Sequence, residues 1–254
     1  LQEVGIIPGI KVDQGAKDMA LHPGEKITEG LDGLRERLVE YRGLGARFAK
    51  WRAVITIGDG IPSPGCIEAN AQALARYAAL CQEGGLVPIV EPEVLMDADN
   101  TIERCYEVTE ATLRRVFAAL YEQRVVLERL ILKTNMVIAG KQCPVQNSVE
   151  EVAEQTVRCL RNSVPAAVAG IVFPSGGQKA EPATAHLNAM NGMGALPWPL
   201  SFSYGRALQD PALKIWAGKS GNVSAAQKAL YHRAKCNGLA SLGQYTPEME
   251  QLAA

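Results

Sequence analysis

Short apolar runs alternate along the chain with longer segments in which apolar residues recur every three or four positions. The short runs predict strands and the longer segments predict helices. We expect strands over residues 5–13, 47–57, 86–91, 130–136, 169–173 and 200–203. Strands that alternate with helices in this way are typical of parallel βαβ units rather than of a β-sandwich.

The segments between these strands carry the helical pattern. We expect helices around residues 31–41 and 71–81, and over 101–123, 148–162, 181–190 and 223–239. Ser148 is followed three residues later by Glu151, the capping-box pattern that begins a helix. Residues 14–29 are polar and are predicted to form a long loop, whose length suggests a function beyond connection.

The number of strands bears on the fold class. We expect an α/β fold, a TIM (β/α)8 barrel, in which about six βα units are visible and roughly two, or about 60 to 90 residues, are missing before Leu1. No linker-like stretch divides the chain, so residues 1–254 are predicted to form a single catalytic barrel domain, N-terminally incomplete.

Composition and charge exclude several classes of partner. The formal net charge of −1 gives no pull toward nucleic acid or an anionic membrane surface. No apolar run approaches the length of a membrane span, and no basic-then-apolar secretion signal opens the sequence. The six cysteines form no CxxC pair, which favours reduced core thiols over disulfides. We therefore expect a cytoplasmic protein with neither nucleic-acid nor membrane partners.

Lys133 lies in the middle of a mainly apolar run at residues 130–137. An ammonium group among aliphatic neighbours costs free energy unless it is paired or used. Desolvation and nearby cations shift such an amine toward its neutral, nucleophilic form, which can attack a carbonyl to make a Schiff base. The sequence therefore marks Lys133 as a candidate nucleophile.

Other charged residues occupy similar places late in predicted strands. Lys50 and Arg52 are two residues apart and so share one face of their strand, as do Glu91 and Glu93 of the next. If consecutive strands are neighbours, Lys11 precedes these four and Lys133 follows them around the sheet. A carboxylate between lysines can carry protons during imine formation and hydrolysis. Glu93 could instead simply neutralise Arg52 or Lys50.

The ends of the last two predicted strands suggest an anion site. Ser175-Gly176-Gly177 follows one strand, and Gly205-Arg206 follows the other. Glycines let backbone N–H groups approach an anion closely, and arginine adds a forked donor. The loops after strands seven and eight are the usual phosphate site of a TIM barrel. A phosphorylated substrate is therefore predicted, although a single Ser-Gly-Gly turn would be an ordinary loop.

Six short motifs together resemble class I fructose-1,6-bisphosphate aldolase, in the order and spacing of that family. They are GIKVD at 9–13, FAKWR at 48–52, VEPE at 90–93, LKTNM at 132–136, SGGQ at 175–178 and SYGRAL at 203–208. The resemblance covers essentially the whole chain. It implies a TIM barrel, a Schiff-base mechanism that needs neither metal nor cofactor, a phosphorylated sugar substrate, and a homotetramer of glycolysis or gluconeogenesis.

The resemblance also implies residue roles. Lys133 corresponds to the Schiff-base lysine, Glu91 to the general acid/base, and Lys50 to the lysine that assists proton transfer. Lys11 and Arg52 are similar to the family's substrate and phosphate contacts. Four residues resemble the cradle of the C1-phosphate, namely Ser175, Gly176, Gly205 and Arg206.

The sequence departs from the family pattern at a few places. Thr134 stands where members of the family commonly have proline. Pro174 stands where they commonly have leucine, and this proline should stiffen the phosphate loop and remove a backbone N–H donor. The aspartate that acts as base in C–C cleavage would lie before Leu1. The tyrosine that ends many eukaryotic members has no counterpart at the end of this sequence.

Three alternative functions stay open at this point. The same machinery could act on another phosphoketose, such as sedoheptulose bisphosphate or fructose 1-phosphate. The barrel could be a non-catalytic scaffold for protein partners, or a phosphosugar isomerase, although an isomerase needs no buried lysines. His22, His186 and His232 are scattered without metal-ligand spacing, so a zinc-dependent aldolase is not expected.

Overall fold

The computed structural model describes residues 2–253 of the chain. A six-stranded parallel sheet forms its centre, with the strands hydrogen-bonded in the order β1 (Gly9–Lys11), β4 (Phe48–Ile55), β5 (Val87–Val94), β6 (Ile131–Lys133), β7 (Gly170–Phe173) and β8 (Leu200–Phe202). Each of these strands falls on a predicted one. Sequence-adjacent strands are also spatial neighbours, as in an arc of a (β/α)8 barrel, so the predicted fold class is confirmed.

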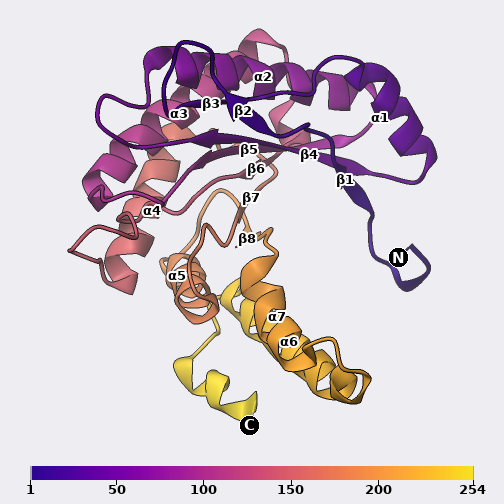
Figure 1. Ribbon diagram of the computed structural model, residues 1–254, viewed down its shortest axis with the longest axis vertical. Helices are drawn as coiled ribbons and strands as arrows, with labels where there is room; N and C mark the ends of the chain where they lie inside the picture. Colours follow the sequence, from indigo (N-terminus) through magenta and orange to yellow (C-terminus); the bar gives the residue numbers. More distant parts are fainter. Residues whose placement is uncertain (1, 254) are drawn as a thin grey trace.

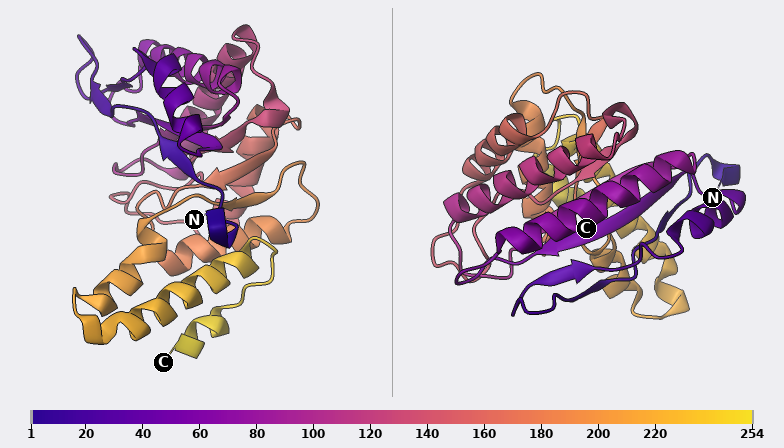
Figure 2. Two further views of the ribbon diagram at one scale, coloured as in Figure 1. Left: turned by 90° about the vertical axis from the view of Figure 1, so that its right-hand side faces the viewer. Right: turned by 90° about the horizontal axis from the view of Figure 1, so that it is seen from above.

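Helices connect the strands and cover the sheet. They are α1 (Leu34–Gly43), α2 (Pro64–Glu83), α3 (Ile102–Glu122), α4 (Val149–Ser163), α5 (Ala180–Gly192), α6 (Arg206–Trp216) and α7 (Val223–Ala240), with short 3-10 helices η1 (Gln2–Val4), η2 (Leu127–Arg129), η3 (Ser220–Asn222) and η4 (Pro247–Ala253). The helices α1 to α3 lie across the sheet near β4 and β5, whereas α6 and α7 form a pair beyond β8 (Figures 1 and 2). The predicted capping box is confirmed, because Glu151 N–H donates to Ser148 Oγ and Ser148 N–H to Glu151.

Two details of the predicted pattern are wrong, and one helix was not predicted. The expected loop 14–29 contains an antiparallel hairpin of β2 (Ala16–Asp18) and β3 (Lys26–Thr28), whose polar strands have no apolar alternation to reveal them. Strand β5 does not end before Pro92 but runs to Val94, because its pairing with β4 continues past the proline. Helix α6, which begins at Arg206 shortly after the end of β8, lies outside all the predicted helices.

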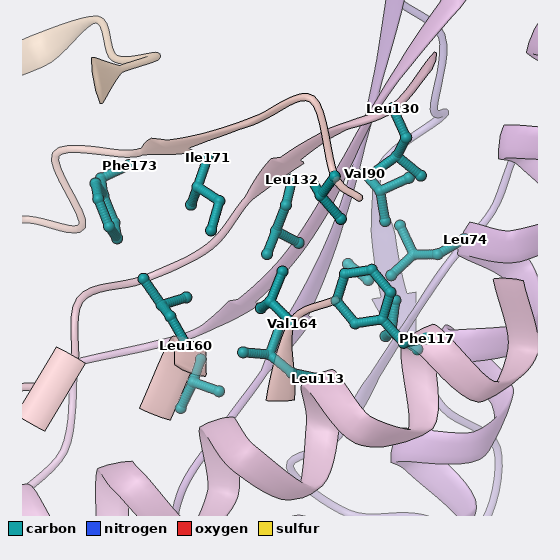
Figure 3. Packing of buried hydrophobic residues seen from close by; sticks show 14 of the residues in the cluster. Leu74, Val90, Leu113, Phe117, Leu130, Leu132, Leu160, Val164, Ile171 and Phe173 are labelled. Carbon is teal, nitrogen blue, oxygen red and sulfur yellow. The ribbon is translucent and has the colours of Figure 1, made fainter. Parts of the chain in front are cut away.

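The core lies between one face of the sheet and the helices, as Figure 3 shows around α3, α4 and strands β5 to β7. Leu113 of α3 and Leu160 of α4 point toward Leu132 of β6, and all three are almost fully buried. Full burial of such side chains is worth about 1.5–3 kcal/mol each. Because strand side chains alternate, this apolar face leaves the opposite face of the strands free for charged residues.

The hydrophobic cluster is continuous from Val12 to Tyr245. The division into domains stays a prediction, and residues 1 and 254 of the predicted domain lie outside the described part. All six cysteines are free and buried, as expected. None of the helices within residues 2–253 combines the length and apolar character that crossing a bilayer requires.

Candidate active site

Strand alternation and register bring the predicted charged residues to one face of the sheet. In β4, Trp51 is fully buried against the helices, so Lys50 and Arg52 point to the opposite face. The register pairs Lys11 of β1 with Lys50, and Arg52 with Glu91 of β5. The side chains that the sequence grouped therefore meet near the carboxyl ends of neighbouring strands.

Glu91 lies at the centre of this group. One of its carboxylate oxygens is 3.0 Å from Lys133 Nζ and the other is 3.0 Å from Lys50 Nζ. The Glu91 side chain is 2% exposed, and those of Lys133 and Lys50 are 11% and 18% exposed. One buried carboxylate thus bridges two lysine side chains that are mostly but not fully buried.

Asp13 is a second buried carboxylate that the sequence reasoning did not assign. It lies 2.5 Å from Lys11 Nζ and 3.8 Å from Lys50 Nζ, and it accepts a hydrogen bond from the Arg52 backbone N–H at 3.2 Å. Its position two residues after Lys11, on the same strand face, was the available signal. Asp13 therefore links the charged ends of β1 and β4.

Glu93 pairs with Arg52 rather than with a lysine. Arg52 Nε donates to Glu93 Oε2 at 2.5 Å. Burial alone would lower the pKa of the Arg52 guanidinium, but the hydrogen bond and charge of Glu93 outweigh burial and raise this pKa. Arg52 is therefore held as a fixed cation beside the lysines, and this contact matches the structural alternative considered for Glu93.

The predicted anion site lies at the ends of β7 and β8. Ser175 follows β7 and is buried, and its Oγ accepts the backbone N–H of Ala207 at 3.3 Å. Gly176 has φ +60°, a conformation that glycine adopts without strain. Gly205 precedes the first turn of α6, and Arg206, its first residue, is exposed. The Ser175 loop and the start of α6 therefore lie in contact.

The helix start itself was not predicted from the sequence. Helix α6 contains Pro211 and begins without a side-chain cap, so it lacks the usual start signals. Its free N–H groups add positive partial charge next to Ser175 and Gly176. The sequence analysis thus predicted the residues that meet here but missed the helix that begins among them.

Comparison with known proteins gives the family. The family "Fructose-bisphosphate aldolase class-I" matches residues 1–254. The chain belongs to the class I fructose-bisphosphate aldolases. These are glycolytic lyases of the Schiff-base type, and the cleavage of fructose 1,6-bisphosphate expected from the sequence motifs is therefore confirmed at the level of the family.

Individual relatives agree with this assignment. A probable class 1 fructose-bisphosphate aldolase of Xanthomonas campestris is 69% identical over 242 residues, which cover 95% of this chain and 72% of that protein. The fructose-bisphosphate aldolase of Dictyostelium discoideum is 54% identical over 98% of this chain and 70% of its own length. A solved structure of the Plasmodium falciparum aldolase superposes with a TM-score of 0.95 at 49% identity, covering 96% of this chain and 71% of that one.

Proposed function

We propose that Lys133 is the nucleophile of this aldolase and that Glu91 moves protons to and from it. The observation that carries this proposal is the pair of 3.0 Å contacts that Glu91 makes with Lys133 and Lys50. A general acid/base must lie within hydrogen-bond reach of the group it serves. Glu91 meets this condition for the nitrogen that would attack the substrate.

The steps follow from these positions. Lys133 Nζ, once deprotonated, attacks the C2 carbonyl of the ketose and forms a carbinolamine. Glu91 in its protonated form gives a proton to the carbinolamine hydroxyl, which leaves as water, and a protonated imine remains. A base removes the proton of the C4 hydroxyl, the C3–C4 bond breaks, and the C4–C6 fragment leaves as glyceraldehyde 3-phosphate. The imine accepts the electron pair of the broken bond and becomes an enamine. Protonation and hydrolysis of the enamine then release dihydroxyacetone phosphate and restore Lys133.

Lys50 and Glu93 support this centre. Lys50 holds the opposite oxygen of Glu91 and lies 3.8 Å from Asp13, so it can pass a proton between the two carboxylates. Glu93 fixes Arg52 through the 2.5 Å hydrogen bond. We assign Lys50 to proton transfer and Glu93 to the placement of Arg52 beside the reacting groups.

The two phosphates of the substrate would bind at opposite sides of the strand ends. Ser175, Gly176, Gly205 and Arg206 form the proposed C1-phosphate site, where a helix N-terminus adds positive potential. Lys11 and Arg52 form the proposed site of the other phosphate. Lys11 suits this role because its side chain is 54% exposed while its charge is anchored to Asp13.

The assembly and location of the enzyme are part of the proposal. We propose a homotetramer, as the family resemblance implies. Relatives from Arabidopsis thaliana are named cytosolic, and one from Pisum sativum cytoplasmic, which supports a cytoplasmic location here. Elution from a calibrated column with light scattering would test the tetramer, and a monomer at micromolar concentration would contradict it.

Comparing fructose 1,6-bisphosphate with fructose 1-phosphate distinguishes the two proposed phosphate sites. Fructose 1-phosphate lacks the second phosphate, so Lys11→Ala should lower kcat/KM for fructose 1,6-bisphosphate about 10- to 100-fold and leave fructose 1-phosphate unchanged. Arg206→Ala should lower kcat/KM for both substrates. Lys17→Ala, at an exposed lysine of β2, is the matched control. Equal losses on both substrates in Lys11→Ala would contradict the assignment.

The same assay addresses the alternatives. Turnover of sedoheptulose bisphosphate or fructose 1-phosphate well above that of fructose 1,6-bisphosphate would favour a different preferred phosphoketose. A Lys133→Ala variant that loses cleavage but keeps full biological function would favour a scaffold role for the protein in the cell. We expect the Lys133→Ala variant to lose both cleavage activity and biological function.

A further inference from the structure

A large cavity lies away from the strand ends, between α6, α7 and η4. Its volume is about 1070 Å³, and its walls include Ile215, Tyr231, His232, Cys236 and Glu250. Figure 1 shows α6, α7 and the C-terminal segment together on the far side of β8 from β4 and β5. The proposed aldol chemistry uses none of these side chains.

Three possible metal ligands meet at the wall of this cavity. His232 and Cys236 lie one turn apart on α7, and η4 brings Glu250 to them. The Cys236 Sγ atom is 3.6 Å from His232 Nε2, and Glu250 Oε2 is 3.5 Å from the same nitrogen. All three donor atoms lie within 4.8 Å of one another. The sequence analysis compared the histidines only with one another and so missed the pairing of His232 with Cys236, four residues later on the same helix.

These distances fit a tetrahedral ion. Zinc binds thiolate sulfur at about 2.3 Å and imidazole nitrogen or carboxylate oxygen at about 2.0–2.2 Å. At the tetrahedral angle, two such ligands are about 3.4–3.6 Å apart. The separations of 3.6 Å and 3.5 Å match this spacing, and the third pair of donor atoms, of Cys236 and Glu250, lies within 4.8 Å.

Neighbouring side chains hold the carboxylate in place. Tyr245 OH donates to Glu250 Oε1 at 2.8 Å, and Arg233 Nη1 donates to Oε2 at 2.5 Å. Arg233 is itself 4% exposed and donates to Thr184 Oγ1 at 2.8 Å. A carboxylate oxygen has two lone pairs, so Oε2 can accept from Arg233 and still bind an ion. Such outer hydrogen bonds are what fix the ligands of metal sites.

We propose that His232, Cys236 and Glu250 bind a borderline-soft divalent cation such as Zn²⁺. Three protein ligands leave the fourth position open to the cavity, where water or a small ligand completes the tetrahedron. Binding displaces the Cys236 thiol proton to solvent, because the thiolate is the ligand. The ion would fasten η4 to α7 and is separate from the Schiff-base reaction, which needs none.

Cobalt is the direct probe of this site. Co²⁺ bound by a thiolate gives an intense sulfur-to-metal charge-transfer absorption. We expect this absorption to saturate at one Co²⁺ per chain, and added Zn²⁺ to abolish it by displacement. The purified protein should also unfold at a higher temperature with Zn²⁺, since the ion binds the folded state.

Variants of the ligands decide the proposal. Cys236→Ala should abolish the absorption, and His232→Gln should weaken Co²⁺ binding more than tenfold. His22→Gln and Cys143→Ala alter the same residue types elsewhere and should leave binding unchanged. If Cys236 were too buried to replace, His232→Gln would still test the site, because this side chain is 19% exposed. Absence of the absorption in the unaltered protein, or its persistence in both ligand variants, would overturn the proposal.

Discussion

Replacing Glu91 by glutamine tests the centre of the proposed active site. The change keeps the shape of the side chain but removes its charge. Lys133 and Lys50 each lie 3.0 Å from a carboxylate oxygen of Glu91, whose side chain is 2% exposed. The variant therefore leaves two nearly buried ammonium groups facing a neutral amide.

The expected cost follows from this geometry. Two unit charges 3.0 Å apart attract by about 5 kcal/mol at an effective dielectric constant near 20. Desolvation offsets part of this attraction, and the freed Lys50 and Lys133 can turn toward water or release a proton. Breaking a buried pair typically costs about 3–5 kcal/mol. We expect Glu91→Gln to lower the free energy of unfolding by about 2–4 kcal/mol.

The fall in kcat should be larger than the lowered free energy of unfolding can explain. A positioned acid/base contributes about 10²–10⁴-fold to a rate. We therefore expect kcat for cleavage of fructose 1,6-bisphosphate to fall by that factor at a temperature where the variant is folded. The assay couples triose phosphate production to NADH oxidation, and circular dichroism during urea titration measures stability.

A surface carboxylate provides the control. Glu83 accepts from Arg35 Nε at 2.6 Å, but both side chains are more than half exposed. Glu83→Gln should change the free energy of unfolding by less than about 1 kcal/mol and leave kcat unaltered. If Glu91→Gln kept the kcat of the unaltered enzyme, the role given to Glu91 would be refuted.

Three further predictions concern stability. Tyr77→Phe removes a buried hydroxyl that donates to Ala49 O at 2.7 Å, and should cost about 1–2 kcal/mol in urea unfolding. Ser148→Ala removes the N-cap of α4 and should cost about 1 kcal/mol, and an unchanged midpoint would contradict the cap. Burial lowers the pKa of His186 from 6.5 to about 4, so the folded state resists its protonation. Stability from this group is present above pH 6.5 and is lost as pH falls toward 4, by about 3 kcal/mol in total. His186→Asn should flatten this part of the stability–pH curve, and an unchanged slope would refute the assignment.

The sequence predicted the placement of site residues well where strand geometry alone determines it. Strand alternation alone placed Lys50 and Arg52 on one face, because side chains in a strand must alternate. Neighbouring parallel strands then brought Glu91 to Lys133. The proposed phosphate site was indicated only by combining two strand ends, Ser175-Gly176-Gly177 after one and Gly205-Arg206 after the other.

The sequence was less informative where partners come from distant segments. The sequence places Asp13 on the strand face of Lys11, but only the pairing of β1 with β4 shows that it contacts Lys50. Glu250 lies near the end of the chain and meets His232 through folding of η4. The hairpin of β2 and β3 is held by side-chain contacts such as Thr28 Oγ1 to Arg52 O, which no local pattern reveals.

The most direct test of the account is reduction of the enzyme by borohydride in the presence of dihydroxyacetone phosphate. Reduction of an imine leaves a stable secondary amine, which adds a fixed mass to the peptide that contains the reacting lysine. We predict one adduct per chain, mapped to Lys133, and none in a Lys133→Ala variant. An adduct on Lys50 or Lys11 instead, or no adduct in an enzyme that still cleaves fructose 1,6-bisphosphate, would contradict the central claim.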